Sequence, residues 1–312
     1  MNYRRMGRTG LRISSVSLGG WLTLGGSVDE ATSRAIVREA LDGGVNFIDL
    51  ADVYSRGESE RVVGSAVADL DRTSLVLSTK VFGRMGEGPN QRGLSRKHVL
   101  ESCEASLRRL GTDYVDLYFC HRPDPETPLE ETVRAMDDLV HRGKVHYWGT
   151  SVWSAELLDA THDLCDRRGY YPPVVEQPEY SLLQRGIEST TLPAAQRLGM
   201  GLVVWSPLAG GLLTGKYDDG TVPAGSRAAE TRWLDGRLDE PTRERLGAFS
   251  GLAAEVGATP AQLALAWILR QEGITSVITG ATGPEHVRAN LAAADLEVSM
   301  ETARRTEEIF PA

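Results

Sequence analysis

The sequence is poor in cysteine, with only Cys103, Cys120 and Cys165 among 312 residues. An odd number cannot pair completely, and two of these cysteines fall in segments with a helical or strand pattern rather than in loops. The cysteines therefore predict no disulfide framework. Their use fits a reducing cytoplasm, where we expect the protein to remain.

Excess positive charge and long apolar runs are also missing. The formal net charge is −9 and no basic run offsets it, which argues against a nucleic acid or an anionic membrane as a partner. No window of about eighteen apolar residues predicts a membrane-spanning helix. The N-terminal segment MNYRRMGRTGLRI lacks the apolar core of a signal peptide. These absences predict a soluble protein.

Short, β-branched apolar runs alternate with segments of helical period along most of the chain. Strands are predicted at residues 16–18, 45–49, 75–80, 115–121, 145–151, 174–177, 201–205 and 276–279. Helices are predicted from residue 29 and at 59–70, 95–110, 128–142, 155–168, 192–198, 241–256 and 260–271, then from 284 and from 299. This alternation indicates a parallel sheet, and eight strands favour a (β/α)₈ TIM barrel that forms a single domain over residues 1–312.

Three segments depart from the repeating pattern. Residues 3–13 have two strand-like pieces around a glycine-containing turn, which predicts a hairpin that caps the closed end of the barrel. The loop GGWLTLGG after the first strand is rich enough in glycine to approach a ligand closely. Residues 206–239 are too long for an ordinary connection between a strand and a helix, and we interpret them as a lid.

Four polar side chains fall at or just past the ends of three successive predicted strands: Asp49, Tyr54, Lys80 and His121. In a barrel these ends open on one face, which is where TIM-barrel enzymes carry out catalysis. A phenol has a pKa of about 10, and an ammonium about 4 Å away lowers that pKa by up to about three units. Asp49 supplies the counter-charge for Lys80, and His121 donates a hydrogen bond to an oxygen that becomes an alkoxide.

Such a site protonates a carbonyl oxygen, and the sequence offers no nucleophile or metal cluster to attack the carbon, so a cofactor hydride is the expected reactant. Trp205 is placed to stack on a nicotinamide ring, with Ser151 and Gln177 at the ends of neighbouring strands to hold its carboxamide. The segment SPLAGGLLTGK and the turn before the helix at Pro284 match phosphate sites. No GxGxxG motif follows the first strand, which argues against a Rossmann domain.

Long strings of the sequence resemble the aldo-keto reductase superfamily, in particular the branch that contains the β subunits of voltage-gated potassium channels. The strings are RGLSRKHVLESCEASLRRL, RPDPETPLEETVRAM, WGTS and WSPLAGGLLTGKY, and the resemblance covers nearly the whole chain. It implies a barrel that binds NADPH across its mouth and reduces aldehydes or ketones without a metal. It also implies that Asp49, Tyr54, Lys80 and His121 are the catalytic tetrad.

The same resemblance implies which residues contact the ligands. The substrate-binding positions are Trp21, Tyr54 and His121. The cofactor-contact positions are Gly20, Trp21, Asp49, Ser151, Gln177, Trp205, Ser206, Pro207, Leu208, Ala209, Gly210, Lys216, Arg227, Gly280, Thr282, His286 and Asn290.

The sequence departs from the family pattern at several positions. Val152 stands where the superfamily commonly has Asn and the channel subunits have Arg, so one polar cofactor contact is absent. Ala289 stands at the position of a Glu that meets the adenine amine, and His286 at a position of Gln or Arg, so both positions bear on the preference for NADPH over NADH. His121 is the imidazole of active reductases, where the mammalian channel subunits have Asn, and it favours turnover.

Two rival functions stay open. One is a redox-sensing regulatory subunit in which bound NADPH is a signal and turnover is slow, and the other is a lyase that uses Lys80 as a Schiff base. Asp49 weighs against the lyase because it keeps the amine of Lys80 protonated. The resemblance further implies a homo-oligomer, a tetramer or larger, while the identity of the carbonyl substrate is not readable.

Overall fold

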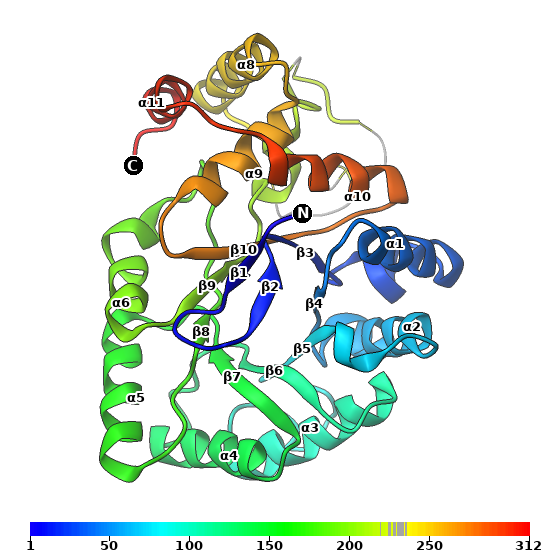
Figure 1. Cartoon of the computed structure of the whole chain (residues 1–312), viewed down its shortest axis with the longest axis vertical. Helices are drawn as coiled ribbons and strands as arrows, with labels where there is room; N and C mark the ends of the chain where they lie inside the picture. Colours follow the sequence, from blue (N-terminus) through cyan, green and yellow to red (C-terminus); the bar gives the residue numbers. More distant parts are fainter. Residues whose placement is uncertain (219, 224–225, 227–228, 230–233, 235) are drawn as a thin grey trace.

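The computed structural model describes residues 1–218, 220–223, 226, 229, 234 and 236–312, and it forms a closed barrel of parallel strands with helices outside (Figure 1). In the described part of the chain, eight strands close the barrel in the order β10-β3-β4-β5-β6-β7-β8-β9. Their bounds are β3 Val16–Gly19, β4 Phe47–Asp49, β5 Val76–Val81, β6 Val115–Cys120, β7 Val145–Thr150, β8 Val175–Glu176, β9 Gly201–Val204 and β10 Ile274–Thr279. The predicted (β/α)₈ TIM barrel is confirmed.

The helices lie outside the barrel and connect its strands. They are α1 Glu30–Asp42, α2 Glu58–Val67, α3 Arg96–Leu110, α4 Leu129–His141, α5 Ala155–Arg168, α6 Thr191–Leu198, α8 Glu240–Glu255, α9 Pro260–Arg270, α10 Pro284–Leu291 and α11 Met300–Ile309. Asp29, Ser95 and Ser154 begin their helices by accepting a backbone N–H bond from three residues further on. Gly111 and Gly169 end α3 and α5 in the left-handed conformation that glycine favours.

The predicted N-terminal hairpin closes one end of the barrel. β1 (Tyr3–Arg5) pairs antiparallel with β2 (Arg12–Ser14), and Figure 1 shows the pair crossing the centre of the barrel. Met6 and Ile13 are fully buried and pack against inward side chains from the barrel strands. Those inward side chains are Phe47, Val76, Leu117, Phe119, Val175, Val203 and Ile278. The hairpin therefore seals an apolar plug and leaves the opposite end of the barrel for polar residues.

The alternation of side chains along a strand decides which residues reach that open end. On β5, Val76 joins the apolar plug, so Ser78 and Lys80 also point inward, while Leu77 and Val81 pack outward against the helices. On β6, the same alternation makes Phe119 point inward, and it gives the same direction to His121, the residue that follows the strand. The sequence pattern thus puts apolar side chains low in the barrel and polar ones at its mouth.

Several predicted strand ends lie one residue past the strand in the structure: His121, Ser151, Gln177 and Trp205. Each of them is still fixed to its neighbour, because its backbone N–H donates a hydrogen bond of 2.8–3.0 Å to the adjacent strand or loop. These residues are therefore held as in a strand, although the regular β-sheet hydrogen bonding ends one residue before them.

The connection after β9 contains η5 (Ala209–Thr214) and then leads to α8. Part of the predicted lid, residues 206–239, lies outside the described residues. The remaining short helical turns are η1 Thr23–Ser27, η2 Tyr54–Gly57, η3 Arg72–Ser74, η4 Gly186–Ser189 and η7 Ala292–Asp295. α8 packs on α11, with the ring centroids of Phe249 and Phe310 5.4 Å apart.

Among the described residues, no single helix is long and apolar enough to cross a membrane. Only α8 and α9 taken together have the length and composition of a membrane-spanning segment, and a bend of 87° separates them.

Candidate active site

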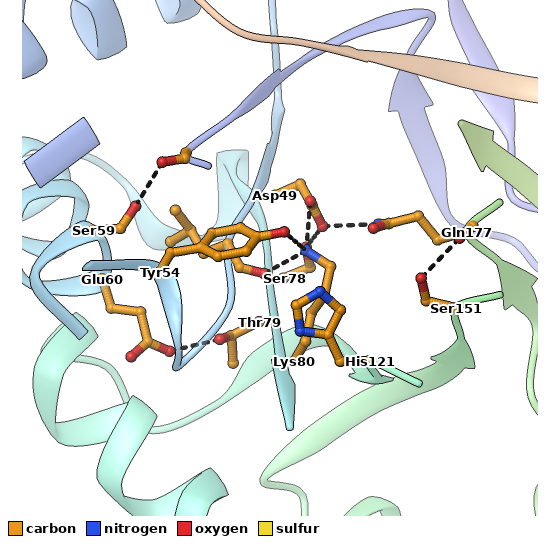
Figure 2. A network of polar contacts seen from close by, with 12 residues as sticks. Asp49, Tyr54, Ser59, Glu60, Ser78, Thr79, Lys80, His121, Ser151 and Gln177 are labelled. Atoms are coloured by element: carbon orange, nitrogen blue, oxygen red, sulfur yellow. Dashed lines mark hydrogen bonds and ion pairs between the residues drawn. The ribbon is translucent and has the colours of Figure 1, made fainter. Parts of the chain in front are cut away.

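Lys80 is the centre of a buried hydrogen-bond network at the mouth of the barrel (Figure 2). Its side chain has no exposed surface, and its ammonium nitrogen donates to Asp49 Oδ2 at 2.6 Å, to Leu50 O at 2.7 Å and to the Tyr54 hydroxyl at 3.2 Å. An ammonium has three donors, so these three acceptors satisfy it completely. The structure therefore brings three residues of the predicted tetrad into direct contact.

His121 completes the group from the end of β6. Its ring meets that of Tyr54 edge-on, with centroids 5.7 Å apart and planes at 77°, and Figure 2 shows both rings beside the Lys80 ammonium. Burial lowers the pKa of His121 to about 2, and the charges of Lys80 and Arg122 act in the same direction. The imidazole is therefore neutral at physiological pH and keeps one N–H as a hydrogen-bond donor.

Asp49 is held by two further donors that the sequence did not predict. Its Oδ1 accepts from Ser78 Oγ at 2.7 Å and from Gln177 Nε2 at 3.0 Å. Ser78 pairs with Asp49 in register and points inward like Lys80, so strand alternation was the signal that could have identified it. Gln177, predicted to hold a nicotinamide carboxamide, instead uses its amide nitrogen on Asp49 and leaves its side-chain carbonyl as the group for such a contact.

The direction of the Tyr54 pKa corrects the sequence-based expectation. Burial raises the pKa of the phenol above its ordinary value of 10.0, and the nearby Lys80, which acts to lower it, does not outweigh that effect. Asp49 adds to the rise because its charge opposes formation of a phenolate. Tyr54 is therefore a protonated phenol here, not a lysine-softened one.

Lys80 stays charged in spite of its burial. Burial acts to lower its pKa, but the attraction of Asp49 and Tyr54 outweighs this effect and raises the pKa above 10.5. A fully protonated amine has no lone pair with which to attack a carbonyl. The geometry thus argues against the lyase alternative.

Backbone strain gathers on the same face of the barrel. In the described part of the chain, every non-glycine residue with positive φ follows the C-terminal end of β3, β4, β7 or β9. These residues are Leu22, Ser55, Arg56, Val152, Ser206 and Ala209. Strained backbone is frequent at functional sites, so this distribution independently marks the open end of the barrel.

The first group of predicted cofactor residues surrounds the network. Gly20 N donates to Asp49 O at 2.9 Å, which fixes the start of the loop that carries Trp21. Ser151 Oγ donates to Gln177 O at 2.8 Å. Trp205 is half-buried beyond β9 and forms a β-bridge with Glu179. These residues line the same end of the barrel as Lys80.

The loop after β9 is a series of tight turns with several left-handed residues. It contains Ser206, Pro207, Leu208, Ala209 and Gly210. Gly211 has φ +102°, a left-handed conformation that favours glycine, and the Lys216 ammonium lies close to it, 3.1 Å from where a Cβ would be. Turns with left-handed residues point backbone N–H groups to one side and bind anions in this way. Arg227, also predicted to contact the cofactor, lies outside the described residues.

The last predicted group lies after β10. Thr282 Oγ1 and His286 Nδ1 are 3.0 Å apart, and Asn290 Nδ2 donates to Gly280 O at 3.4 Å. α10 begins after Gly283 without a side-chain cap; Pro284 has no N–H and His286 N donates to Gly283 O at 3.1 Å, so the positive end of the helix dipole is what this turn offers to a phosphate. β10 pairs with β9, so the two segments that carry these residues follow neighbouring strands at the same end of the barrel. The residues present therefore fit a dinucleotide cofactor.

Three charged residues of this region were not identified from the sequence as site residues. Arg122 follows His121 directly, and Asp52 and Glu176 are fully buried carboxyl groups.

Among the described residues, no group of three or more His, Cys, Asp or Glu side chains forms a metal site, and all three cysteines are free and buried.

This barrel and the side chains at its mouth agree with the resemblance noted in the sequence. The chain belongs to the aldo/keto reductase family, whose model matches residues 15–310. Membership makes oxidation and reduction the class of chemistry that the site supports.

Among curated proteins, the chain is similar to proteins named as potassium channel subunits. It is 44% identical over 302 residues to the "Probable voltage-gated potassium channel subunit beta" of Oryza sativa subsp. japonica, with 95% of this chain and 92% of the relative covered. An Arabidopsis thaliana protein of the same name is 43% identical with the same coverage. A Schizosaccharomyces pombe protein, also named as a voltage-gated potassium channel subunit beta, is 43% identical and covers 99% of this chain and 93% of its own length.

Proposed function

We propose that this protein is an NADPH-dependent reductase of aldehydes and ketones. The observation that supports this most strongly is the buried Lys80 ammonium, which contacts both Asp49 and the hydroxyl of Tyr54 while a neutral His121 faces the same phenol. NADPH, when bound, supplies a hydride to a carbonyl carbon. The residues of this chain then have to orient the carbonyl and deliver a proton to its oxygen.

Tyr54 is the proton donor in this proposal. Its raised pKa keeps the hydroxyl protonated, and Lys80 offers a positive charge that stabilises the phenolate as the proton leaves. His121 donates an N–H hydrogen bond to the carbonyl oxygen, where negative charge develops. Asp49, fixed by Ser78 and Gln177, holds the ammonium in place.

The cofactor residues would divide the dinucleotide between them. Trp205, Ser151 and Gln177 surround the nicotinamide position, the loop with Lys216 holds the pyrophosphate, and the start of α10 with Thr282 and His286 holds the adenosine phosphate. His286 would favour the extra phosphate of NADPH over NADH because it places an N–H donor beside that phosphate. Ala289 offers no polar group to the adenine.

The direct test mixes purified protein with NADPH and 4-nitrobenzaldehyde and follows both NADPH absorbance and alcohol formation. We expect one NADPH consumed for each alcohol formed over many turnovers, and slower reaction with NADH. Lys216→Gln should raise the KM for NADPH with little change in kcat. Absence of alcohol with either cofactor would refute the reductase. Trapping of a carbonyl compound on Lys80 by borohydride would instead support the lyase.

The names of the relatives favour a second candidate, a regulatory subunit in which NADPH is a redox signal. Turnover would then be slow, and cofactor would remain bound through purification. A burst of one NADPH oxidised per protein followed by slow release would support this role. We also propose assembly into a homo-oligomer, which light scattering would measure.

A further inference from the structure

Arg122 is a cation at the mouth of the barrel that the proposed mechanism does not use. It directly follows His121, and its Nη1 donates to the backbone carbonyl of His121 and to Ser151 Oγ, the latter at 3.3 Å. Its guanidinium carbon lies 5.9 Å from the centroid of the Trp205 ring. Arg122 therefore sits between the proposed proton-donor group and the proposed nicotinamide position.

The partners of Arg122 are uncharged. Within the ranges that the structure describes, the guanidinium forms no ion pair, and its hydrogen bonds go to a carbonyl and a hydroxyl. The two acidic side chains whose pKa it influences have other partners: Glu176 accepts from Thr150 Oγ1 and Trp153 N, and Glu179 lies 4.0 Å from Arg237. Lys80, in contrast, is neutralised by Asp49. Arg122 thus contributes a positive charge to the mouth without a paired carboxylate among the described residues, in a chain whose formal net charge is −9.

This charge acts on the groups that would react. Arg122 contributes to the low pKa of His121 and acts to lower the pKa of Tyr54, so its field reaches both rings. A guanidinium offers five N–H donors in a planar fork that matches a carboxylate. Nη1 is the donor group already engaged with the protein, and the rest of the fork remains for a ligand.

We propose that Arg122 recognises an anionic group on the substrate, so that the preferred substrates are aldehydes or ketones that carry a carboxylate. The inference rests on the proposed reductase function and adds the chemical class of the substrate. A carboxylate on the substrate pairs with Arg122 while the carbonyl oxygen lies against Tyr54 and His121. Half-burial of Arg122 strengthens this pair, because a partly desolvated ion pair is screened less than an exposed one.

The test compares two aldehydes that differ in charge, 4-carboxybenzaldehyde and its neutral methyl ester, with NADPH as cofactor. The measured quantity is kcat/KM for the acid divided by kcat/KM for the ester. Comparing this ratio between proteins cancels the different intrinsic reactivity of the two carbonyls. Arg122→Gln should lower the ratio by about 10- to 100-fold, the range of one charge-assisted hydrogen bond, and Arg122→Lys should lower it less.

A matched variant controls for net charge. Arg134 is an exposed residue on α4, outside the barrel, so Arg134→Gln should leave the ratio unchanged. Inhibition by benzoate tests the same contact without using an acid as the substrate. Benzoate should inhibit reduction of the ester more strongly in the wild type than in Arg122→Gln, whereas benzamide should inhibit the two proteins equally.

The outcomes separate this inference from the function on which it rests. If both aldehydes are reduced and their ratio is the same in wild type and Arg122→Gln, the assignment of Arg122 is overturned and the reductase stands. If the wild-type protein reduces neither compound, the reductase and the anion site both fail. A fall in the ratio in Arg122→Gln but not in Arg134→Gln supports the inference.

Discussion

The Lys80 ammonium lies 3.2 Å from the Tyr54 hydroxyl, yet the pKa of that phenol is raised rather than lowered. Burial outweighs the attraction of the neighbouring charge. The lysine therefore does not create a resting phenolate. The Lys80 charge instead stabilises the phenolate as the proton leaves Tyr54. A general acid needs both properties: it must be protonated at rest, and its deprotonated form must be stabilised during the transfer.

The pH dependence of carbonyl reduction follows from these pKa directions. Tyr54 acts as a donor while protonated, so its activity is present below its raised pKa and is lost only above about pH 10. His121, with a pKa of about 2, does not titrate in the working range. We expect kcat to show no ionisation of either residue between about pH 5 and 9. An acid limb near the ordinary pKa of histidine, absent from a His121→Asn variant, would contradict the neutral imidazole.

The Lys80 and Asp49 pair should show strong coupling in stability. Lys80→Met leaves a buried carboxylate without its cation, which should lower the free energy of unfolding by about 3–5 kcal/mol. Asp49→Asn added to Lys80→Met removes the orphaned charge, so the double variant should be more stable than Lys80→Met alone. Both proteins should lack reductase activity. Urea unfolding of the four proteins in this cycle measures the coupling, and simple additivity would show that the pair is not a unit.

Asp52 should make the fold less stable as pH rises. Burial raises its pKa from 3.8 to about 8, with the charge of Glu60 acting in the same direction, and neither side-chain oxygen has a hydrogen-bond partner among the described residues. The folded state thus holds a proton that the unfolded chain releases, so stability is full below about pH 4 and is lost as pH rises through about 8, by up to about 1.4 kcal/mol per pH unit.

Asp52→Asn isolates this contribution because asparagine does not ionise. Glu176, whose pKa burial raises to about 7, contributes in the same direction at lower pH. Between pH 7 and 8, Asp52 therefore causes most of the change in unfolding free energy that comes from these two carboxyl groups. In Asp52→Asn, the slope of unfolding free energy against pH should flatten in this interval. An unchanged slope would mean that Asp52 is already ionised in the folded protein.

Val152 should be a site of stored strain. It is β-branched, has φ +60° and is 44% exposed, so little packing offsets its left-handed backbone. Val152→Asn should raise the free energy of unfolding by about 1 kcal/mol, since asparagine tolerates this conformation. Val152→Thr keeps the branch and adds a polar group, so it should give no such gain. Equal stability of the two variants would exclude strain as the cause.

The parts of the site that the sequence predicted are those set by strand periodicity. Asp49 and Lys80 lie at the ends of apolar runs whose alternation points them inward, and the barrel then brings them together. Gln177 binds Asp49 across 128 positions in sequence, a contact that no local pattern specifies. The direction of the Tyr54 pKa depends on a balance between burial and charge, which requires the packed structure.

The most direct measurement of the central claim is a comparison of Tyr54→Phe with the wild type in a single turnover of bound NADPH with 4-nitrobenzaldehyde. Quenching of protein fluorescence gives the Kd for NADPH in the same samples. We expect the variant to bind NADPH almost as tightly and to react about 100- to 10,000-fold more slowly, because only the proton donor is removed. A Tyr54→Phe protein that oxidises NADPH at the wild-type rate would contradict the account.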